Sequence, residues 1–155
     1  FGAGMAQLHQ KQIVAPLKDA LDAGIPYLGI CLGMQFLFED SDEMGDHTGL
    51  GVLPGKVRRF PKDHPFKVPH MGWNQLIPTR ETPLLAGIPN GSFAYFVHSY
   101  YCLPDDPQDT IINADYGLQF AVGVQRANIF GVQFHPEKSQ KVGLRLLENF
   151  LGVEQ

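Results

Sequence analysis

The sequence has 155 residues, of which 44% are hydrophobic and 18% are charged, and these proportions are typical of one globular domain. The formal net charge of −4 gives no reason to expect a nucleic acid or an anionic membrane surface as a partner. No apolar run approaches the roughly 18 residues that a membrane-spanning helix needs, so no membrane partner is expected. The two cysteines favour free thiols in a reducing cytosol over a disulfide, and the predicted location is cytoplasmic.

The first forty residues alternate between helical and extended patterns. Residues 5–23 carry apolar side chains at helical spacing in two pieces, with Pro16 in a first turn and Gly24 ending the helix. Residues 26–30 form a short apolar run that predicts a buried strand, and residues 32–39 predict a helix. This order of helix, strand and helix with tight connections is typical of α/β domains.

The second half is rich in strands. After a polar, glycine-bearing loop at 41–54, β-branched and aromatic residues predict strands at 57–60, 73–77, 93–101, 110–114, 121–125 and 129–134. Residues 127–128 predict a tight hairpin turn between the last two strands, where Asn128 can tolerate a positive φ. Residues 140–151 predict a closing helix, so the expected fold is α/β with a strand-rich second half.

A nucleophile motif lies at the junction of the strand at 26–30 and the helix that follows it. The motif is Gly29-Ile30-Cys31-Leu32-Gly33, and its small residues two before and two after the cysteine let a strand and a helix pass closely. The helix N-terminus would favour the thiolate, and the Leu32 N–H would point toward a developing oxyanion. The alternative is that Cys31 is a small buried hydrophobic residue.

A candidate base follows the last predicted strand. His135 and Glu137 flank Pro136, whose ring restricts its own φ and the conformation of His135. In a triad the histidine accepts the thiol proton and the carboxylate orients the imidazole. The alternative is a strand-end histidine capped by a carboxylate, but together with Cys31 the pattern favours a catalytic triad.

Metal and nucleotide sites are not expected. The histidines are dispersed, and neither H-E-x-x-H nor C-x-x-C occurs in the sequence. The glycines form neither G-x-G-x-x-G nor a P-loop, so no cofactor is expected.

These motifs together resemble the class I (triad) glutamine amidotransferases, and most closely the family of glutaminase subunits of imidazole glycerol phosphate synthase. The resemblance extends from Phe1 to Leu151 and is carried by four segments, of which the first and last mark the superfamily. The segments are Gly29–Gln35 (GICLGMQ), Val68–Asn74 (VPHMGWN), Tyr95–Tyr100 (YFVHSY) and Gly131–Ser139 (GVQFHPEKS).

The resemblance implies a flavodoxin-like mixed sheet flanked by helices, with residues 1–155 as one type 1 amidotransferase domain. It implies that L-glutamine is hydrolysed through a thioester at Cys31 and that the ammonia passes to a (β/α)₈-barrel cyclase subunit in histidine biosynthesis. Cys31, His135 and Glu137 would be the triad. The implied substrate and oxyanion residues are Leu32, Gln35, Glu43, Val97, His98, Ser99 and Tyr100.

The resemblance also implies a surface toward the cyclase and the ammonia passage, made of Met71, Gly72, Trp73, Asn74, Tyr95 and Lys138. From the residues alone, Trp73 and Tyr95 would be core aromatics and Lys138 a solvated charge. The family has a preceding segment with the first strand and a P-G-V-G loop that supplies part of the oxyanion hole. The domain is therefore expected to be N-terminally incomplete.

Three alternatives remain open at the level of sequence. The chain could serve another synthase, such as one for anthranilate or guanylate, although such a subunit should lack the P-H-M-G-W-N run. It could be an inactive fragment that only binds a barrel partner. It could also be a stand-alone cysteine hydrolase or peptidase, which Gln35 and Glu43, placed for a free amino acid, disfavour.

Overall fold

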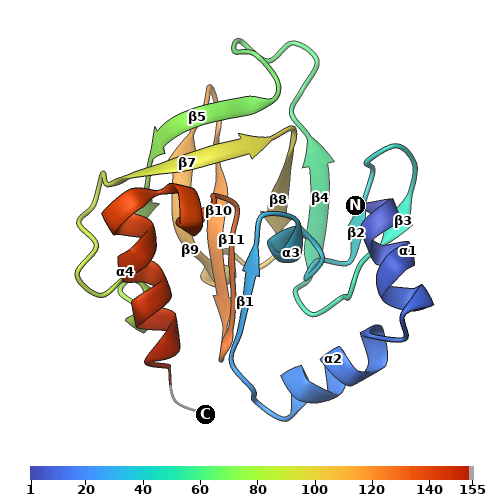
Figure 1. Ribbon diagram of the computed structural model, residues 1–155. Helices are drawn as coiled ribbons and strands as arrows, with labels where there is room; N and C mark the ends of the chain where they lie inside the picture. Colours follow the sequence, from blue (N-terminus) through green and yellow to red (C-terminus); the bar gives the residue numbers. More distant parts are fainter. Residues whose placement is uncertain (154–155) are drawn as a thin grey trace.

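The computed structural model describes residues 1–153, and a mixed β-sheet lies at its centre (Figure 1). Its longer strands are β1 (Tyr27–Ile30), β4 (Gly55–Arg59), β8 (Tyr100–Pro104), β9 (Thr110–Asp115), β10 (Gln119–Arg126) and β11 (Ile129–Val132). Its two-residue strands are β2 (Asp40–Ser41), β3 (His47–Thr48) and β6 (Ile77–Pro78). The strand order is β1-β11-β10-β8-β4-β2-β3, while β9 pairs with β10 and with β6. The α/β class expected from the sequence is confirmed.

Two further strands form a separate antiparallel pair, β5 (His70–Gln75) and β7 (Phe93–His98), which crosses one end of the main sheet (Figure 1). Their register places His70 opposite His98 and Trp73 opposite Tyr95. Since partners in a strand pair carry their side chains on the same face, two histidines lie together and two aromatic residues lie together.

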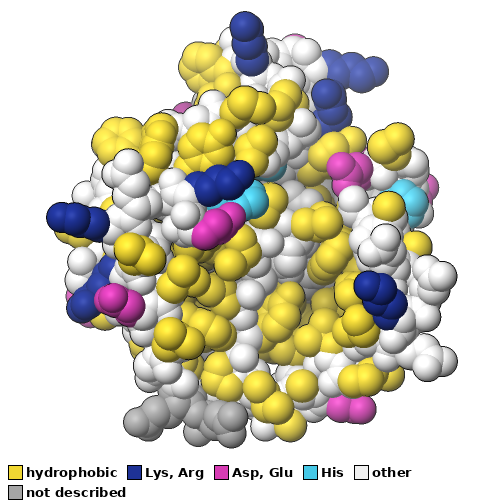
Figure 2. Space-filling view, viewed as in Figure 1, with side chains coloured by type: hydrophobic (Ala, Val, Ile, Leu, Met, Phe, Trp, Pro, Cys, Tyr) yellow, Lys and Arg dark blue, Asp and Glu magenta, His cyan; other side chains and the backbone are white. Residues whose placement is uncertain are grey.

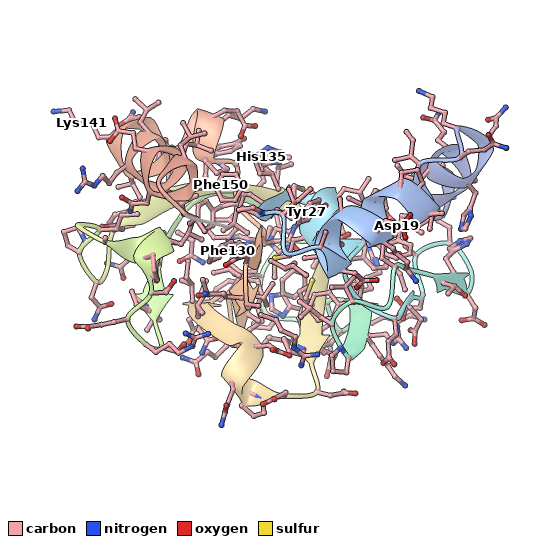
Figure 3. All side chains as sticks on the ribbon, turned by 90° about the horizontal axis from the view of Figure 1, so that it is seen from below. Asp19, Tyr27, Phe130, His135, Lys141 and Phe150 are labelled. Carbon is pink, nitrogen blue, oxygen red and sulfur yellow. The ribbon has the colours of Figure 1, made fainter. Side chains whose placement is uncertain are left out.

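The α-helices lie on one side of the sheet, as Figure 3 shows from below. They are α1 (Gly2–Gln10), α2 (Val14–Asp22), the single-turn α3 (Leu32–Gln35) and α4 (Gln140–Leu151), and three short 3₁₀ helices are η1 (Pro83–Leu85), η2 (Pro107–Asp109) and η3 (Pro136–Lys138). Pro16 lies in the first turn of α2, and Gly24 follows this helix with φ 80° in open space, as predicted. Within residues 1–153 no helix is long and apolar enough to cross a membrane.

Two apolar clusters form the core. One contains the phenylalanines at 60, 96, 120, 130 and 134, and the other packs Met34, Leu37 and Phe38 against Val57 and Cys102. Complete burial of each large apolar side chain stabilises the fold by about 1.5–3 kcal/mol. Both cysteines are free, as predicted.

The predicted helix at 32–39 is too long, because the structure ends α3 at Gln35. The N–H groups of Leu37 and Phe38 donate to carbonyls three residues back, and the Glu39 N–H donates to the Gly55 carbonyl at 3.1 Å, so the i→i−4 pattern of an α-helix stops. The carbonyls of residues 36–38 accept hydrogen bonds from the backbone of residues 50–53, at 2.8–3.1 Å. The loop predicted at 41–54 is also partly wrong. Its first residue belongs to the short strand β2, and the short strand β3 lies within it. These contacts fasten the loop against the segment that follows the nucleophile.

Two strand predictions and one turn prediction need correction. The predicted strand at 93–101 is two strands, because β7 pairs with β5 whereas β8 pairs with β4 and β10. Likewise, the strand predicted at 73–77 divides into β5 and β6. In the hairpin at 127–128 the positive φ, 50°, belongs to Ala127 and not to Asn128.

Candidate active site

Cys31 lies at a sharp turn between β1 and α3, as the sequence predicts. Its φ of 52° and ψ of −107° place it in a region that residues with a side chain seldom adopt. Its backbone N–H donates to the Val132 carbonyl at 2.8 Å, which ties the turn to the neighbouring strand. A Cβ at Gly29 would lie 2.4 Å from the Gly33 carbonyl oxygen, so only glycine permits this approach of strand and helix.

Burial dominates the electrostatics of the thiol. It raises the pKa of Cys31 above the ordinary value, although hydrogen bonds from the Leu32 backbone and the Gln133 side chain act to lower it. The charges of Glu137 and Lys138 also act on Cys31, in opposite directions. The helix N-terminus thus acts in the predicted direction through the Leu32 N–H, but desolvation is the larger effect on the Cys31 pKa.

His135 and Glu137 meet directly after β11. Nδ1 of His135 lies 2.7 Å from Oε1 of Glu137, and the imidazole is largely buried while half of the carboxylate side chain is exposed. Partial burial raises the pKa of Glu137, but hydrogen bonds from its own backbone and from His135 outweigh this and hold it below the ordinary value. A charged carboxylate thus faces Nδ1 and leaves Nε2 of the ring available.

Parallel pairing brings the thiol and the imidazole to the same end of the sheet. β1 and β11 are in register with Ile30 opposite Val132, so Cys31 and His135 both follow carboxyl ends of adjacent strands. His135 lies on the helix-bearing side of the sheet (Figure 3). On that side Figure 2 shows an imidazole, an acidic and a basic side chain gathered at one place. The two halves of the predicted triad are thereby brought together.

A pair of buried amides lies beside the thiol. Gln35 Nε2 donates to the Tyr100 carbonyl at 3.2 Å and to Oε1 of Gln133 at 3.1 Å, and Gln133 Nε2 lies 3.7 Å from the Cys31 sulfur. The sequence predicts a role for Gln35 but misses Gln133. The available signal was a polar residue in an otherwise apolar strand end, Val132 to Phe134.

The predicted substrate segment 97–100 joins β7 to β8 next to the triad. The His135 backbone N–H donates to the Tyr95 carbonyl at 3.0 Å, which fixes β7 against the loop that carries the base. The His98 side chain is buried and donates to the Tyr100 carbonyl at 2.8 Å. The segment therefore presents both backbone and an inward histidine to the site.

Glu43 lies elsewhere along the site's edge. Its backbone N–H donates to Ser41 Oγ at 3.2 Å. Within residues 1–153, no hydrogen bond or ion pair joins Glu43 to Cys31 or His135. The structure thus does not bring Glu43 into contact with the candidate catalytic residues.

The residues predicted to face a partner gather on β5 and β7. Trp73 is 48% exposed and Met71 is 61% exposed, so the alternative of a core tryptophan is wrong. The rings of Trp73 and Tyr95 meet edge to face with centroids 6.0 Å apart, and Lys138 Nζ lies 5.8 Å from the Tyr95 centroid. Apolar side chains gather over this pair of strands in Figure 2.

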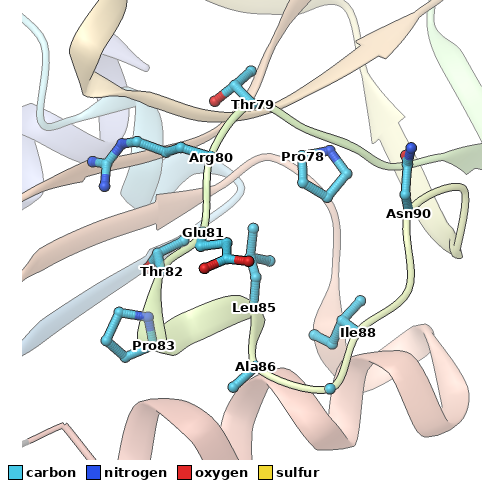
Figure 4. Close-up of a pocket in the computed structure, with 11 residues that line it drawn as sticks. Pro78, Thr79, Arg80, Glu81, Thr82, Pro83, Leu85, Ala86, Ile88 and Asn90 are labelled. Atoms are coloured by element: carbon cyan, nitrogen blue, oxygen red, sulfur yellow. The ribbon is translucent and has the colours of Figure 1, made fainter.

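One cavity of the structure lies apart from this cluster. It measures about 790 Å³ and is lined by the loop from Pro78 to Asn90, without any of the predicted site residues (Figure 4). Within the described part of the chain, no group of three or more His, Cys, Asp or Glu side chains could hold a metal ion.

Known proteins share both sequence and fold with this chain. A family model described as glutamine amidotransferase class-I matches residues 3–153. The imidazole glycerol phosphate synthase subunit HisH of Moorella thermoacetica is 51% identical over 150 residues, which cover 97% of this chain and 70% of that protein. The protein of the same name from Bacillus cereus is 49% identical over 154 residues, which cover 99% of this chain and 72% of that protein.

Two solved structures share the fold at low sequence identity. A glutamine amidotransferase from Thermotoga maritima has a TM-score of 0.62 at 19% identity, covering 92% of this chain and 54% of its own. Another glutamine amidotransferase has a TM-score of 0.68 at 17% identity, covering 94% of this chain and 71% of its own. The family model and the sequence relatives show that this chain belongs to the class-I glutamine amidotransferase family.

Proposed function

We propose that the chain is the glutaminase subunit of imidazole glycerol phosphate synthase. The relatives that carry this name are 47–51% identical over nearly the whole chain. The observation that carries the catalytic part is the turn that places Cys31 beside the strand end bearing the His135–Glu137 pair. The reaction is hydrolysis of L-glutamine to L-glutamate and ammonia, and its setting is a reducing cytoplasm in which both thiols stay free.

In the first half of the reaction, His135 Nε2 takes the Cys31 proton as the sulfur attacks the side-chain carboxamide carbon. Because burial raises the thiol pKa, proton removal and attack are coupled and do not depend on a preformed thiolate. The Leu32 N–H faces the oxygen that becomes negative. Collapse of the tetrahedral intermediate breaks the carbon–nitrogen bond, and the imidazolium protonates the departing ammonia.

In the second half, water hydrolyses the thioester. His135 takes a proton from the water as its oxygen attacks the carbonyl carbon, and the carbon–sulfur bond then breaks to give glutamate. The proton on His135 returns to the sulfur. Throughout, Glu137 holds Nδ1 and stabilises the charged ring.

Glutamine recognition is assigned to groups around this centre. Gln35 uses both amide hydrogens within the protein, so its oxygen is the atom left for a substrate N–H. The backbone of residues 97–100 would line the side chain of glutamine. The Glu43 carboxylate has the charge that suits an α-ammonium.

The partner is assigned as a (β/α)₈-barrel cyclase subunit, which receives the ammonia. Its binding surface on this chain consists of Met71, Gly72, Trp73, Asn74, Tyr95 and Lys138. This assignment is supported by the exposed aromatic pair and by the short path along the chain from Lys138 to His135, which joins the surface to the base. Exposed aromatic residues beside a cation are typical of interface centres.

The test is glutamine hydrolysis by Cys31→Ala and Cys102→Ala variants, measured with the cyclase subunit present. Cys31→Ala should lose at least about a thousandfold in rate, because the nucleophile of a triad is irreplaceable. Cys102 is fully buried, so Cys102→Ala should retain activity and serve as the control. Wild-type rates from Cys31→Ala would overturn the proposal. Replacing the cyclase by an anthranilate or guanylate acceptor synthase should abolish coupled synthesis, and synthesis there would instead favour that pathway.

A further inference from the structure

Two buried histidines that the proposed reaction does not use form a hydrogen-bonded chain leading toward the thiol. Asn74 Nδ2 lies 3.3 Å from His70 Nε2, and it also donates to the Asp115 carbonyl at 2.8 Å. His70 Nδ1 lies 3.0 Å from His98 Nε2. His98 Nδ1 lies 2.8 Å from the Tyr100 carbonyl oxygen.

The partners at each end determine where the hydrogens sit. A carbonyl only accepts, so His98 carries its hydrogen on Nδ1 and its Nε2 must accept when the ring is neutral. His70 must therefore donate from Nδ1, and its Nε2 accepts from the Asn74 amide. A second proton on either ring would set two donors against each other. In agreement, burial lowers the pKa of His70 to about 4 and that of His98 to about 3.

Aromatic rings hold the pair in place. His70 is stacked between Phe96 and Tyr116, with ring centroids 4.8 and 4.1 Å away, and His98 packs against Phe60 at 5.5 Å. Three other titratable groups act on the pair. The charge of His64 acts on His70 and that of His135 acts on His98, and the Tyr116 ring, which carries a hydroxyl, stacks on His70. A shallow surface cavity of about 280 Å³ lies outside His70.

Beyond the histidines, the same carbonyl orients the amides beside the nucleophile. The Tyr100 oxygen accepts from His98 and from Gln35, so both of its lone pairs are used. Gln35 gives its second hydrogen to Oε1 of Gln133. Gln133 must then turn Nε2 toward the Cys31 sulfur, 3.7 Å away. Each orientation in this series is fixed by its neighbour.

We propose that His70 and His98 are positioning residues: as two neutral imidazoles protonated on Nδ1, they hold the Tyr100 carbonyl, which orients the Gln35 amide and through it aims the Gln133 amide at Cys31. This role depends on the proposed function in one respect, which is that Cys31 is the nucleophile of the glutaminase reaction. The inference adds two side chains to the machinery of the site and assigns each a protonation state.

The first test reads the protonation of both histidines in the wild-type chain. The chain is labelled with ¹⁵N-histidine, and two-bond ¹H–¹⁵N correlations are recorded between pH 8 and 5.5, with His70→Asn and His98→Asn identifying the signals. Both rings should show a protonated Nδ1 and an unprotonated Nε2 throughout this range. An Nε2-protonated His98, or protonation of either ring above pH 5.5, would overturn the proposal.

The second test separates positioning from simple packing, in a Cys102→Ala background where Cys31 is the sole thiol. His98→Asn places an amide donor where Nδ1 was, whereas His98→Gln places its amide where Nε2 was. The pH midpoint of Cys31 labelling by iodoacetamide should rise by about one pH unit in His98→Gln. Near neutral pH the thiolate fraction, and with it the labelling rate, should then fall about tenfold. His98→Asn should keep the wild-type midpoint.

Unmoved midpoints in both variants, with only a lower melting temperature, would show packing alone and overturn the positioning role. If His98→Gln does not fold, the tautomers of the wild-type chain still decide the matter. Glutamine turnover is measured separately. Predicted tautomers and midpoints without turnover would contradict the proposed function while supporting the positioning role.

Discussion

The side-chain nitrogen of Gln35 lies 3.1 Å from Oε1 of Gln133, and this contact decides which end of the Gln133 amide faces the nucleophile. With the oxygen engaged, the nitrogen is turned toward the Cys31 sulfur. A hydrogen donated to sulfur favours the thiolate over the thiol, and here it opposes the effect of burial. Gln133 therefore tunes the reactivity of a thiol that its surroundings would otherwise suppress.

Replacing Gln133 by Leu should make Cys31 less reactive. Because the Gln133 hydrogen bond lowers the Cys31 pKa, its loss raises that pKa, and the thiolate fraction near pH 7.5 falls. The pH midpoint of iodoacetamide labelling should move upward. The free energy of unfolding should fall by about 1–3 kcal/mol, since Gln35 keeps a buried N–H without its partner. Gln119→Leu, at an exposed position of β10, is the control, and an unchanged labelling midpoint in Gln133→Leu would refute the argument.

Replacing Glu137 by Gln should reduce the rate of glutamine hydrolysis by about a hundredfold or more, because an amide does not stabilise the imidazolium. The lowered pKa of Glu137 keeps the wild-type carboxylate charged down to pH values below its ordinary range. The negative charge that stabilises the His135 imidazolium is thus fully present above the ordinary carboxyl pKa. It is lost as pH falls through the lowered pKa of Glu137. Glu148→Gln, on the exposed face of α4, should leave kcat unchanged.

The sequence predicted the elements that carry the triad because these depend on local patterns. Short apolar runs before Cys31 and His135 marked β1 and β11, and their parallel pairing brings the motifs together. The prediction of a helix at 32–39 failed for a non-local reason. The Glu39 N–H donates to the carbonyl of Gly55, on the neighbouring strand β4, and not to the carbonyl of Gln35 four residues before it.

The buried polar network was also beyond local reasoning. His70 and His98 lie 28 residues apart, and Gln35 and Gln133 lie 98 residues apart. No spacing rule connects such pairs. Only the antiparallel register of β5 and β7, and the adjacency of β1 and β11, place them in contact.

Two glycines of the nucleophile motif should respond differently to alanine. A Cβ at Gly29 would lie 2.4 Å from the Gly33 carbonyl oxygen, whereas a Cβ at Gly33 would meet only the Tyr27 hydroxyl, at 3.6 Å. Gly29→Ala should therefore destabilise the chain by about 2 kcal/mol or more and displace Cys31. Gly33→Ala should be neutral or stabilising by up to about 1 kcal/mol. Urea unfolding measures both, and equal effects would contradict the close approach at Gly29.

Trp73→Ala should weaken binding of the cyclase subunit without unfolding the chain. The indole is half exposed and rests against the Tyr95 ring, so its truncation removes a rigid surface group and little core. Interface centres built on tryptophan lose about 2 kcal/mol or more on such truncation, which is roughly a thirtyfold rise in Kd. Calorimetric titration of the cyclase measures this change.

The matched control is Leu151→Ala, whose side chain is 83% exposed. Leu151 is the last residue of α4, and the C-terminal end of this helix lies far from β5 and β7 in Figure 1. This substitution removes a comparable exposed apolar side chain from the opposite end of the molecule and should leave Kd unchanged. Equal Kd values for wild type and Trp73→Ala would place the docking surface elsewhere. If instead both variants bind more weakly, the partner covers the helix side of the sheet as well, because one compact patch on β5 and β7 does not reach Leu151.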